Sequence, residues 1–317
     1  MSKYNIIVSD HDFDNLLIER QTLKDIGEVR DASTDEDIDS QLIDADAIIN
    51  LRYPIGEDLI GRLKTCQVIS RYGIGVDNIA IKAATDCGIP VTNVPEYCIE
   101  EVSIHTLSLL LPLIRGVKSY DASIAHGGWD REVAIPIHRF SSLTVGIVGF
   151  GAIGRMIAHH IDALGAAVIT SDPFIDQQTA SAHNATVVGF NELLERADAV
   201  TIHSPLTDTT CGMFGTDAFA RMRDSAVLVN VARGPIIDYE ALRVALDTNE
   251  IAGAGLDVFP NEPPKKDDSL CNHENVLTTP HIAWYSEEAN TERRHEAARN
   301  VRMELLDQQS NNVVNDV

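Results

Sequence analysis

The chain has 317 residues, of which 44% are hydrophobic, and this suits a globular protein of two domains of roughly 100–200 residues each. Its formal net charge of −23 argues against nucleic acids and anionic membranes as partners, because both would be repelled. No apolar run reaches the roughly 18 residues of a membrane span, and the longest, Thr106–Ile114, contains Pro112 and precedes Arg115.

Strand-like and helix-like segments alternate along most of the chain, which predicts parallel sheets flanked by helices. The N-terminus enters a strand directly, without the apolar segment of a signal peptide. In the first part, the predicted strands are Asn5–Ser9, Ala47–Leu51, Gln67–Ser70 and Pro90–Asn93, and the predicted helices are Leu16–Ile26, Asp58–Lys64 and Ile79–Asp86. A longer helix is predicted over Ile99–Ser119.

A glycine-rich turn follows an apolar strand in VGIVGFGAIG, Val145–Gly154. Gly149 permits the tight turn, and Gly151 lets a pyrophosphate approach the backbone. Gly154 lets the following helix pack close to the strand. The first turn of that helix presents N–H groups and a positive dipole end to the phosphates. The pattern predicts a dinucleotide site.

Asp172 lies 18 residues beyond the last glycine, at the end of a second strand-like segment, AAVITSD. Its carboxylate can accept hydrogen bonds from a ribose diol and would repel a 2′-phosphate, so NAD is predicted rather than NADP. The glycine pattern alone recurs by chance, and a glycine-rich turn in another α/β protein is the alternative. The order strand, glycines, helix, strand and acid favours the dinucleotide.

Further strands and a terminal helix follow this turn. The strands are expected at Val168–Ser171, Ala199–His203, Ala226–Asn230 and Ala252–Asp257. The segment Glu287–Asp307 is charged and amphipathic, with no strand after it. It predicts a long helix that returns to pack on the first domain.

Three chemically active side chains stand in loops after predicted strands, where ligands bind in open α/β sheets: Arg233 in NVARG, Glu262 in FPNEP and His281 in TPHIAWY. Arg233 offers a two-pronged donor to a carboxylate and a neighbouring carbonyl. His281 can exchange the proton that accompanies hydride transfer, and Glu262 would stabilise the imidazolium and fix its orientation. Taken singly, each has a plainer role, as a surface arginine, a solvated glutamate or a structural histidine. Their shared placement favours catalysis.

Composition also bears on the cellular setting. Five scattered cysteines form no C-x-x-C pair, which predicts reduced thiols in a cytoplasm and no zinc site. Lysine occurs only seven times, against eighteen arginines. The acidic surface fits a protein adapted to a high-salt cytoplasm, and an ordinary acidic protein is the alternative.

The wider pattern resembles a known family. Its motifs are RYGIGVDNIAIKAA (71–84), NVPEYCIEEVSIHTL (93–107), VGIVGFGAIG, NVARGPIID (230–238), AGAGLDVFPNEP (253–264) and TPHIAWYSEEA (279–289). Together they resemble the NAD-dependent D-2-hydroxyacid dehydrogenases, most of all their C-terminal-binding-protein-like members. The resemblance implies an α/β protein of two Rossmann-like domains. A flavodoxin-like, discontinuous catalytic domain would comprise residues 1–98 and 287–317, and a doubly wound NAD-binding domain, residues 99–286, would be inserted into it.

The resemblance also implies roles for individual residues. Its catalytic trio falls on Arg233, Glu262 and His281. Cofactor contacts fall on Thr106, Gly149, Gly151, Ala152, Ile153, Gly154, Asp172, His203, Pro205, Thr210, Val231, Ala232, Arg233, Asp257 and His281. Substrate contacts fall on Arg71, Gly73, Ile74, Gly75, Arg233, His281 and Trp284. For Trp284, packing between the domains is the alternative to a place in the substrate pocket. No metal is implied.

These residues predict an enzyme that interconverts a 2-oxo acid and a D-2-hydroxy acid with NAD. Phosphoglycerate, or glyoxylate and hydroxypyruvate, are alternative substrates, although the few lysines offer little to a phosphorylated one. An NAD(H)-sensing binding protein with little turnover is the alternative from another class. The complete trio argues against a sensor, which needs no proton donor. Family resemblance implies a homodimer formed through residues 99–140.

Overall fold

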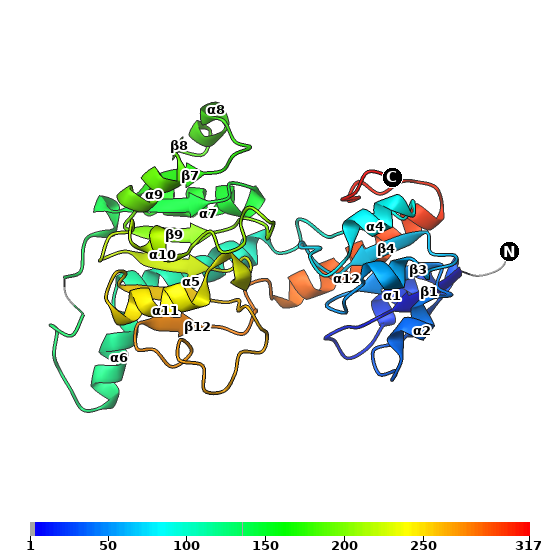
Figure 1. The fold of residues 1–317 in the computed structure, drawn as a ribbon, viewed down its shortest axis with the longest axis horizontal. Helices are drawn as coiled ribbons and strands as arrows, with labels where there is room; N and C mark the ends of the chain where they lie inside the picture. Colours follow the sequence, from blue (N-terminus) through cyan, green and yellow to red (C-terminus); the bar gives the residue numbers. More distant parts are fainter. Residues whose placement is uncertain (1–3, 135) are drawn as a thin grey trace. The chain divides into compact units, whose positions relative to one another are not determined.

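The computed structural model describes residues 4–134 and 136–317. Contacts divide the chain into two compact units (Figure 1). Unit 1 comprises Met1–Cys98 and Ser286–Val317, and unit 2 comprises Ile99–Tyr285. None of the helices in the described ranges combines the length and apolar character needed to cross a membrane.

Unit 1 contains a five-stranded parallel sheet in the order β2-β1-β3-β4-β5. Its strands are β1 (Tyr4–Val8), β2 (Gly27–Asp31), β3 (Ala47–Asn50), β4 (Val68–Arg71) and β5 (Val91–Thr92). This is the flavodoxin-like order, in which the direction of winding reverses between β1 and β3. The inner strands β3 and β4 are almost wholly buried, because helices cover both faces of the sheet.

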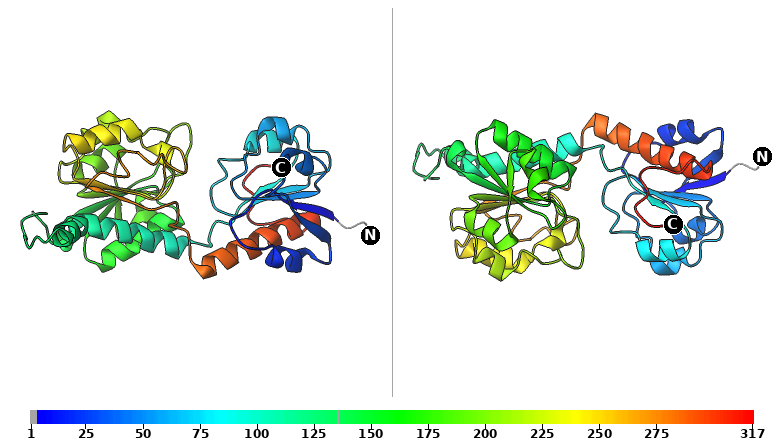
Figure 2. Two further views of the ribbon diagram at one scale, coloured as in Figure 1. Left: turned by 90° about the horizontal axis from the view of Figure 1, so that it is seen from below. Right: turned by 90° about the horizontal axis from the view of Figure 1, so that it is seen from above.

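Each face of the unit 1 sheet has its own helices (Figure 2). α1 (Leu17–Leu23) packs beside α12 (Glu287–Leu305), and α12 also contacts β3 and β4. On the other face, α2 (Ile38–Leu42), α3 (Glu57–Ile60) and α4 (Ile81–Asp86) bury an apolar cluster that includes Leu42, Ile48 and Ile60. The terminal helix predicted over Glu287–Asp307 is therefore present, and it completes the unit that the N-terminal residues begin.

Unit 2 contains a seven-stranded parallel sheet in the order β12-β11-β10-β9-β6-β7-β8. Its strands are β6 (Thr144–Val148), β7 (Ala167–Ser171), β8 (Ala185–Val187), β9 (Ala199–Ile202), β10 (Val227–Asn230), β11 (Gly253–Leu256) and β12 (Val276–Thr278). The winding reverses between β6 and β9, which makes this the topological switch point of a doubly wound sheet. The predicted α/β class with two Rossmann-like sheets is confirmed.

Helices cover both faces of the unit 2 sheet (Figure 2). On one face, α5 (Ile99–Ile114) lies beside α7 (Ala152–Ala163). The other face is covered by α9 (Phe190–Arg196), α10 (Thr216–Phe219) and α11 (Tyr239–Asp247), which share a core with Leu193, Phe219 and Leu242. A short α8 (Gln177–Ser181) precedes β8.

The single helix predicted over Ile99–Ser119 is wrong. It is two helices, α5 and α6 (Val117–Ala125), separated at Gly116, whose φ of 62° lies in the left-handed region. Pro112 lies inside α5 without ending it. The break starts a new helix axis, so α6 leaves the body of unit 2 (Figure 1).

Candidate functional site

The glycine turn after β6 has a different steric constraint at each position. Gly149 has a φ of +91°, and a Cβ there would lie 2.7 Å from the backbone carbon of His203. A Cβ on Gly154 would lie 2.3 Å from the carbonyl oxygen of Gly149. A Cβ on Gly151 would meet no described atom within 4 Å. Two glycines are therefore required by packing, whereas Gly151 borders open space that a phosphate group could occupy.

The N-terminus of α7 points its first amides toward the same turn. Gly151 is the N-cap residue, and no side-chain cap bonds to these amides in the described chain. Ala152 and Ile153 form the first turn, where N–H groups lack partners within the helix. Such amides, with the positive end of the helix dipole, favour an anion. These residues therefore fit a pyrophosphate.

Asp172 lies directly after β7 and beside the glycine turn. Its Oδ2 accepts a hydrogen bond from the Phe150 amide at 2.7 Å, and its Oδ1 accepts one from the Phe174 amide at 2.9 Å. Each carboxylate oxygen can accept further hydrogen bonds. The structure thus brings the predicted ribose acceptor to the predicted phosphate turn, and this carboxylate fits a dinucleotide without a 2′-phosphate.

His203 follows β9 on the opposite side of the switch point. Its amide donates to the Val148 carbonyl at 2.7 Å, and neither ring nitrogen has a hydrogen-bond partner among the described residues. Burial lowers the pKa of its imidazole from 6.5 to about 3. The ring is therefore neutral at physiological pH and carries one donor and one acceptor for a polar partner. Its predicted cofactor contact remains a prediction.

Arg233 extends from the loop after β10, and its backbone is held by Asn230. The Asn230 side chain donates to the Arg233 carbonyl at 2.9 Å and accepts from the Ala232 amide at 3.0 Å. The Arg233 guanidinium donates to the Ala232 carbonyl at 2.8 Å. Val231 is buried at the start of this loop. No sequence signal singled out Asn230, although its amide fixes the shape of the predicted Arg233 loop.

His281 and Glu262 are in direct contact. His281 Nδ1 lies 2.6 Å from Glu262 Oε2, and the two side chains are about one-third exposed, at 30% and 34%. Glu262 Oε1 accepts from the Phe259 amide at 3.0 Å, which holds the carboxylate in place. The backbone of His281 adopts a φ of +53°, a conformation that non-glycine residues rarely adopt. The structure brings together the predicted acid–base residue and its acidic neighbour.

Asp257 holds the segment that carries His281. Its carboxylate is completely buried and accepts from the Thr279 hydroxyl at 2.6 Å and from the amides of Ile282 and Ala283 at 2.9 Å. Its carbonyl accepts from the His281 amide at 2.7 Å. These bonds over-determine the turn and maintain the unusual His281 conformation. The predicted contact of Asp257 with the nicotinamide remains a prediction, and its supporting role was not predicted.

The other predicted residues of unit 2 are satisfied locally. The Thr106 hydroxyl donates to the Val102 carbonyl within α5, and the Thr210 hydroxyl donates to the Pro205 carbonyl, so the loop folds on itself. Trp284 Nε1 donates to the His281 carbonyl at 2.9 Å. The Trp284 indole is therefore tied to the His281 turn. Its predicted contact with substrate remains a prediction.

The predicted substrate loop, residues 71–75, belongs to unit 1. Arg71 Nε donates to the Leu51 carbonyl at 3.2 Å, and a Cβ on Gly73 would lie 2.5 Å from Arg71 Nη1. The Gly73 amide donates to the Arg71 carbonyl at 2.9 Å, and the Asn93 side chain donates to the Ile74 carbonyl at 2.7 Å. The arginine thus lies against its own loop, and glycine at position 73 makes room for it.

Comparison with known proteins identifies the family. The family model described as D-isomer specific 2-hydroxyacid dehydrogenase, NAD binding domain, matches residues 107–283. The chain belongs to this family.

Several relatives agree with this assignment. A D-3-phosphoglycerate dehydrogenase from Methanocaldococcus jannaschii is 36% identical over 92% of this chain and 56% of its own length. A glycerate dehydrogenase from Methylorubrum extorquens is 34% identical over 81% of each chain. The crystal structure of a D-lactate dehydrogenase from Aquifex aeolicus, complexed with NAD and lactic acid, superposes with a TM-score of 0.88 at 26% identity, over 98% of this chain and 99% of that one.

The chain spans about half the length of the phosphoglycerate dehydrogenases it matches. The dehydrogenase family and the NAD-binding domain predicted from the sequence are confirmed. The closer likeness to C-terminal-binding-protein-like members remains a prediction. NAD is the cofactor, and the glycine turn, the first amides of α7 and Asp172 are the residues that fit it.

Replacing Gly151 with valine should raise the dissociation constant of NADH by about 10–100-fold, because the side chain would fill space beside the α7 amides. Gly189→Val is the matched control. Gly189 is also an N-cap glycine with an extended backbone, and a Cβ there meets no described atom within 4 Å. Fluorescence titration with NADH measures both variants. Equal affinities would contradict the assignment of Gly151.

Proposed function

We propose that the chain interconverts a 2-oxo acid and a D-2-hydroxy acid, with His281 as the general acid and base. The contact between His281 Nδ1 and Glu262 Oε2, at 2.6 Å, carries this proposal. A carboxylate on Nδ1 fixes the tautomer and leaves Nε2 as the ring atom that exchanges a proton. The contact lies in a domain whose family model is that of an NAD-binding dehydrogenase domain.

Each remaining group has a distinct task in this mechanism. The nicotinamide cofactor, when bound, supplies or accepts the hydride. The planar guanidinium of Arg233 binds the substrate carboxylate and the neighbouring carbonyl oxygen by paired hydrogen bonds. His281 donates a proton to that oxygen during reduction and removes it during oxidation, while Glu262 stabilises the imidazolium. In unit 1, the carboxylate contact predicted for Gly73, Ile74 and Gly75 falls to the amides of Ile74 and Gly75, because the Gly73 amide already donates to the Arg71 carbonyl.

A panel of 2-oxo acids with NADH tests the reaction and its substrate range, followed by the absorbance of the reduced cofactor. Pyruvate, larger 2-oxo acids, glyoxylate, hydroxypyruvate and phosphohydroxypyruvate belong in it, because relatives are named for phosphoglycerate and glycerate. Absence of turnover with every acid, by protein that binds NADH, would contradict the proposal and favour an NAD(H)-sensing protein.

His281→Ala should lower kcat by about 10²–10⁴-fold, because the proton donor is lost. His295→Ala is the control, since that histidine is exposed on α12 and lies outside residues 99–140. NADH affinity should change little in either variant. Turnover of His281→Ala within about threefold of wild type would remove His281 from the mechanism.

We also propose a homodimer formed through residues 99–140, of which residue 135 lies outside the described residues. Large apolar side chains are exposed along this stretch: Trp129 at 93%, Ile124 at 53%, Val117 at 50% and Val133 at 45%. Such a concentration of exposed apolar groups marks an interaction surface.

Trp129→Glu should shift the protein toward monomer, because it places a charge in the core of the proposed interface. Phe174→Glu is the matched control, since Phe174 is equally exposed, at 92%, elsewhere in unit 2. Analytical ultracentrifugation over a range of concentrations measures both variants. A monomeric wild type, or a Trp129→Glu dimer of unchanged affinity, would refute this surface.

Finally, we propose that the protein works in a cytoplasm of high salt. All five cysteines are free, as suits a reducing compartment, and the net charge of −23 requires screening. Raising KCl from about 0.01 M to 1 M shortens the Debye length from about 30 to 3 Å, so the melting temperature should rise by more than about 5 °C. Full activity and an unchanged melting temperature in dilute buffer would contradict salt adaptation.

A further inference from the structure

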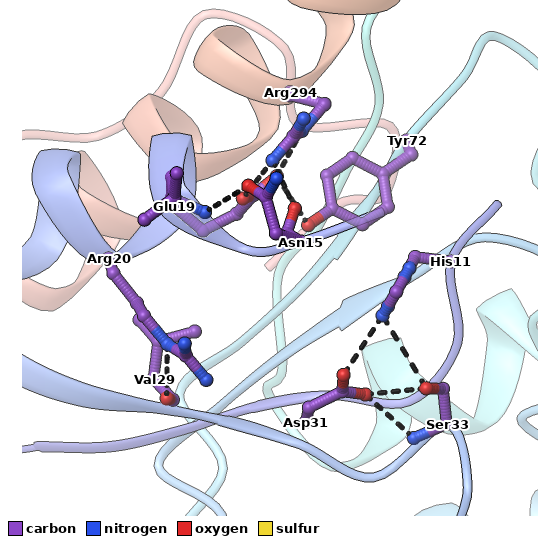
Figure 3. Close-up of polar contacts among 10 residues, drawn as sticks. His11, Asn15, Glu19, Arg20, Val29, Asp31, Ser33, Tyr72 and Arg294 are labelled. Atoms are coloured by element: carbon purple, nitrogen blue, oxygen red, sulfur yellow. Dashed lines mark hydrogen bonds and ion pairs between the residues drawn. The ribbon is translucent and has the colours of Figure 1, made fainter. Parts of the chain in front are cut away.

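A buried cluster in unit 1 lies directly behind the proposed carboxylate-binding loop. Arg294 of α12 binds Glu19 of α1 through two hydrogen bonds, Nε to Oε1 at 2.9 Å and Nη2 to Oε2 at 2.8 Å. Tyr72 donates from its hydroxyl to the same Oε1 at 3.0 Å (Figure 3). Tyr72 stands between Arg71 and Gly73 in the 71–75 loop. Its hydrogen bond to Glu19 therefore anchors that loop to the cluster.

The cluster excludes water. Glu19 is completely buried, Tyr72 is 1% exposed and Arg294 is 8% exposed. Phe13 covers them, with its ring centroid 3.9 Å from Arg294 Cζ and 5.4 Å from the Tyr72 ring, which it meets edge-on. Burial, and secondly the nearby Glu19 carboxylate, raise the pKa of Tyr72 well above its usual value. The phenol therefore stays protonated and donates to Glu19.

Helix α12 supports the same loop at two further points. The Ser70 hydroxyl, in β4, donates to the Ala297 carbonyl at 3.0 Å. The Asn300 side chain donates to the Asn93 carbonyl at 2.9 Å, and the Asn93 side chain donates to the Ile74 carbonyl at 2.7 Å. The loop is thus held at Ser70, at Tyr72 and at Ile74. Each of these contacts is made by α12 directly or through one intermediate residue.

Stability alone does not account for this arrangement. A buried ion pair gives little net stability compared with apolar side chains of the same volume, because both charges must leave water. It does impose direction, since a bidentate arginine fixes the carboxylate plane and the carboxylate fixes the phenol. Directional support is what a loop needs when its backbone amides must face one small anion.

We propose that Glu19 and Arg294 are positioning residues for substrate binding: through Tyr72 they hold the amides of Ile74 and Gly75 in the geometry that receives the carboxylate of the 2-oxo acid. This inference rests on the proposed function. Neither residue touches the substrate, and their loss acts through the loop.

Tyr72→Phe removes one hydroxyl and leaves the Glu19–Arg294 pair intact. Its KM for the 2-oxo acid should rise about tenfold, because the loop loses its tie to Glu19 and its amides are less well oriented toward the carboxylate. kcat at saturation and the dissociation constant of NADH should change less than about twofold. Tyr4→Phe is the matched control, because it removes a phenol bond to the Leu305 carbonyl, at the far end of α12. Its KM should equal that of wild type.

Glu19→Gln and Glu19→Ala separate positioning from folding. Glutamine keeps an oxygen that accepts from Tyr72, so its KM should lie between those of wild type and Glu19→Ala. Melting temperatures are measured for every variant, and rates are expressed per NADH-binding site. A variant that loses stability while its KM stays at the wild-type value would show a structural role only and overturn the proposal.

Binding of oxamate, an unreactive analogue of a 2-oxo acid, to the NADH-loaded protein provides a readout independent of turnover. Calorimetry should give a dissociation constant about tenfold higher for Tyr72→Phe than for Tyr4→Phe. Wild-type protein that binds oxamate but reduces no 2-oxo acid would refute the proposed function, and the two variants would still decide the inference. Equal oxamate affinities in the variants would overturn the inference alone. Absence of oxamate binding by wild type would overturn both.

Discussion

Parallel strands need crossover connections, and every strand pair in the described parts of both sheets is parallel. All strands of one sheet therefore end at the same edge, and the loops that follow them gather there. In unit 2 this edge collects Gly149, Asp172, His203 and Arg233 from four different strands. In unit 1 the corresponding edge carries the 71–75 loop. The chemistry is thus distributed along the sequence and assembled by strand direction.

Within each unit, strand direction gathers the loops at one edge of the sheet, and a buried carboxylate then holds one of these loops in place. Asp257 in unit 2 and Glu19 in unit 1 are both completely buried. Each organises a loop on its own sheet: Asp257 the turn of His281, and Glu19 the turn of Tyr72. A buried charge is costly unless its hydrogen bonds are satisfied, so such a group tolerates few alternative arrangements around it. Each of the two loops therefore depends on its own buried acid, Asp257 in unit 2 and Glu19 in unit 1.

The sequence predicts well those features whose cause is local. The Val145–Gly154 turn needs glycine at particular steps, and Asp172 follows at a spacing set by one helix and one strand. The strand β2 (Gly27–Asp31) was missed because it lies at the sheet edge, where only Gly27 and Val29 are buried and the apolar pattern is weak. The break at Gly116 was missed because apolar spacing continues across it, while the change of direction resides in one positive φ.

Contacts between residues far apart in the sequence leave no local pattern from which they can be predicted. Glu19 and Arg294 are 275 residues apart, and each looks like an ordinary charged residue of an amphipathic helix. The sequence predicts a strand that ends at Asp257. The hydrogen bonds between Asp257 and the His281 turn depend on how β11 and β12 align, which the sequence pattern does not give. Residues that react are recognisable by type and position, whereas residues that hold them become apparent only when the fold is known.

The path of the chain has a consequence for how the protein folds during synthesis. Unit 2 is complete at Tyr285, but unit 1 lacks α12 until Leu305 has emerged. Until then one face of the unit 1 sheet has no cover from that helix, and Glu19 has no arginine partner. Of these two units, unit 1 begins first in the sequence but is completed later, and unit 2 is the nascent unit able to fold first.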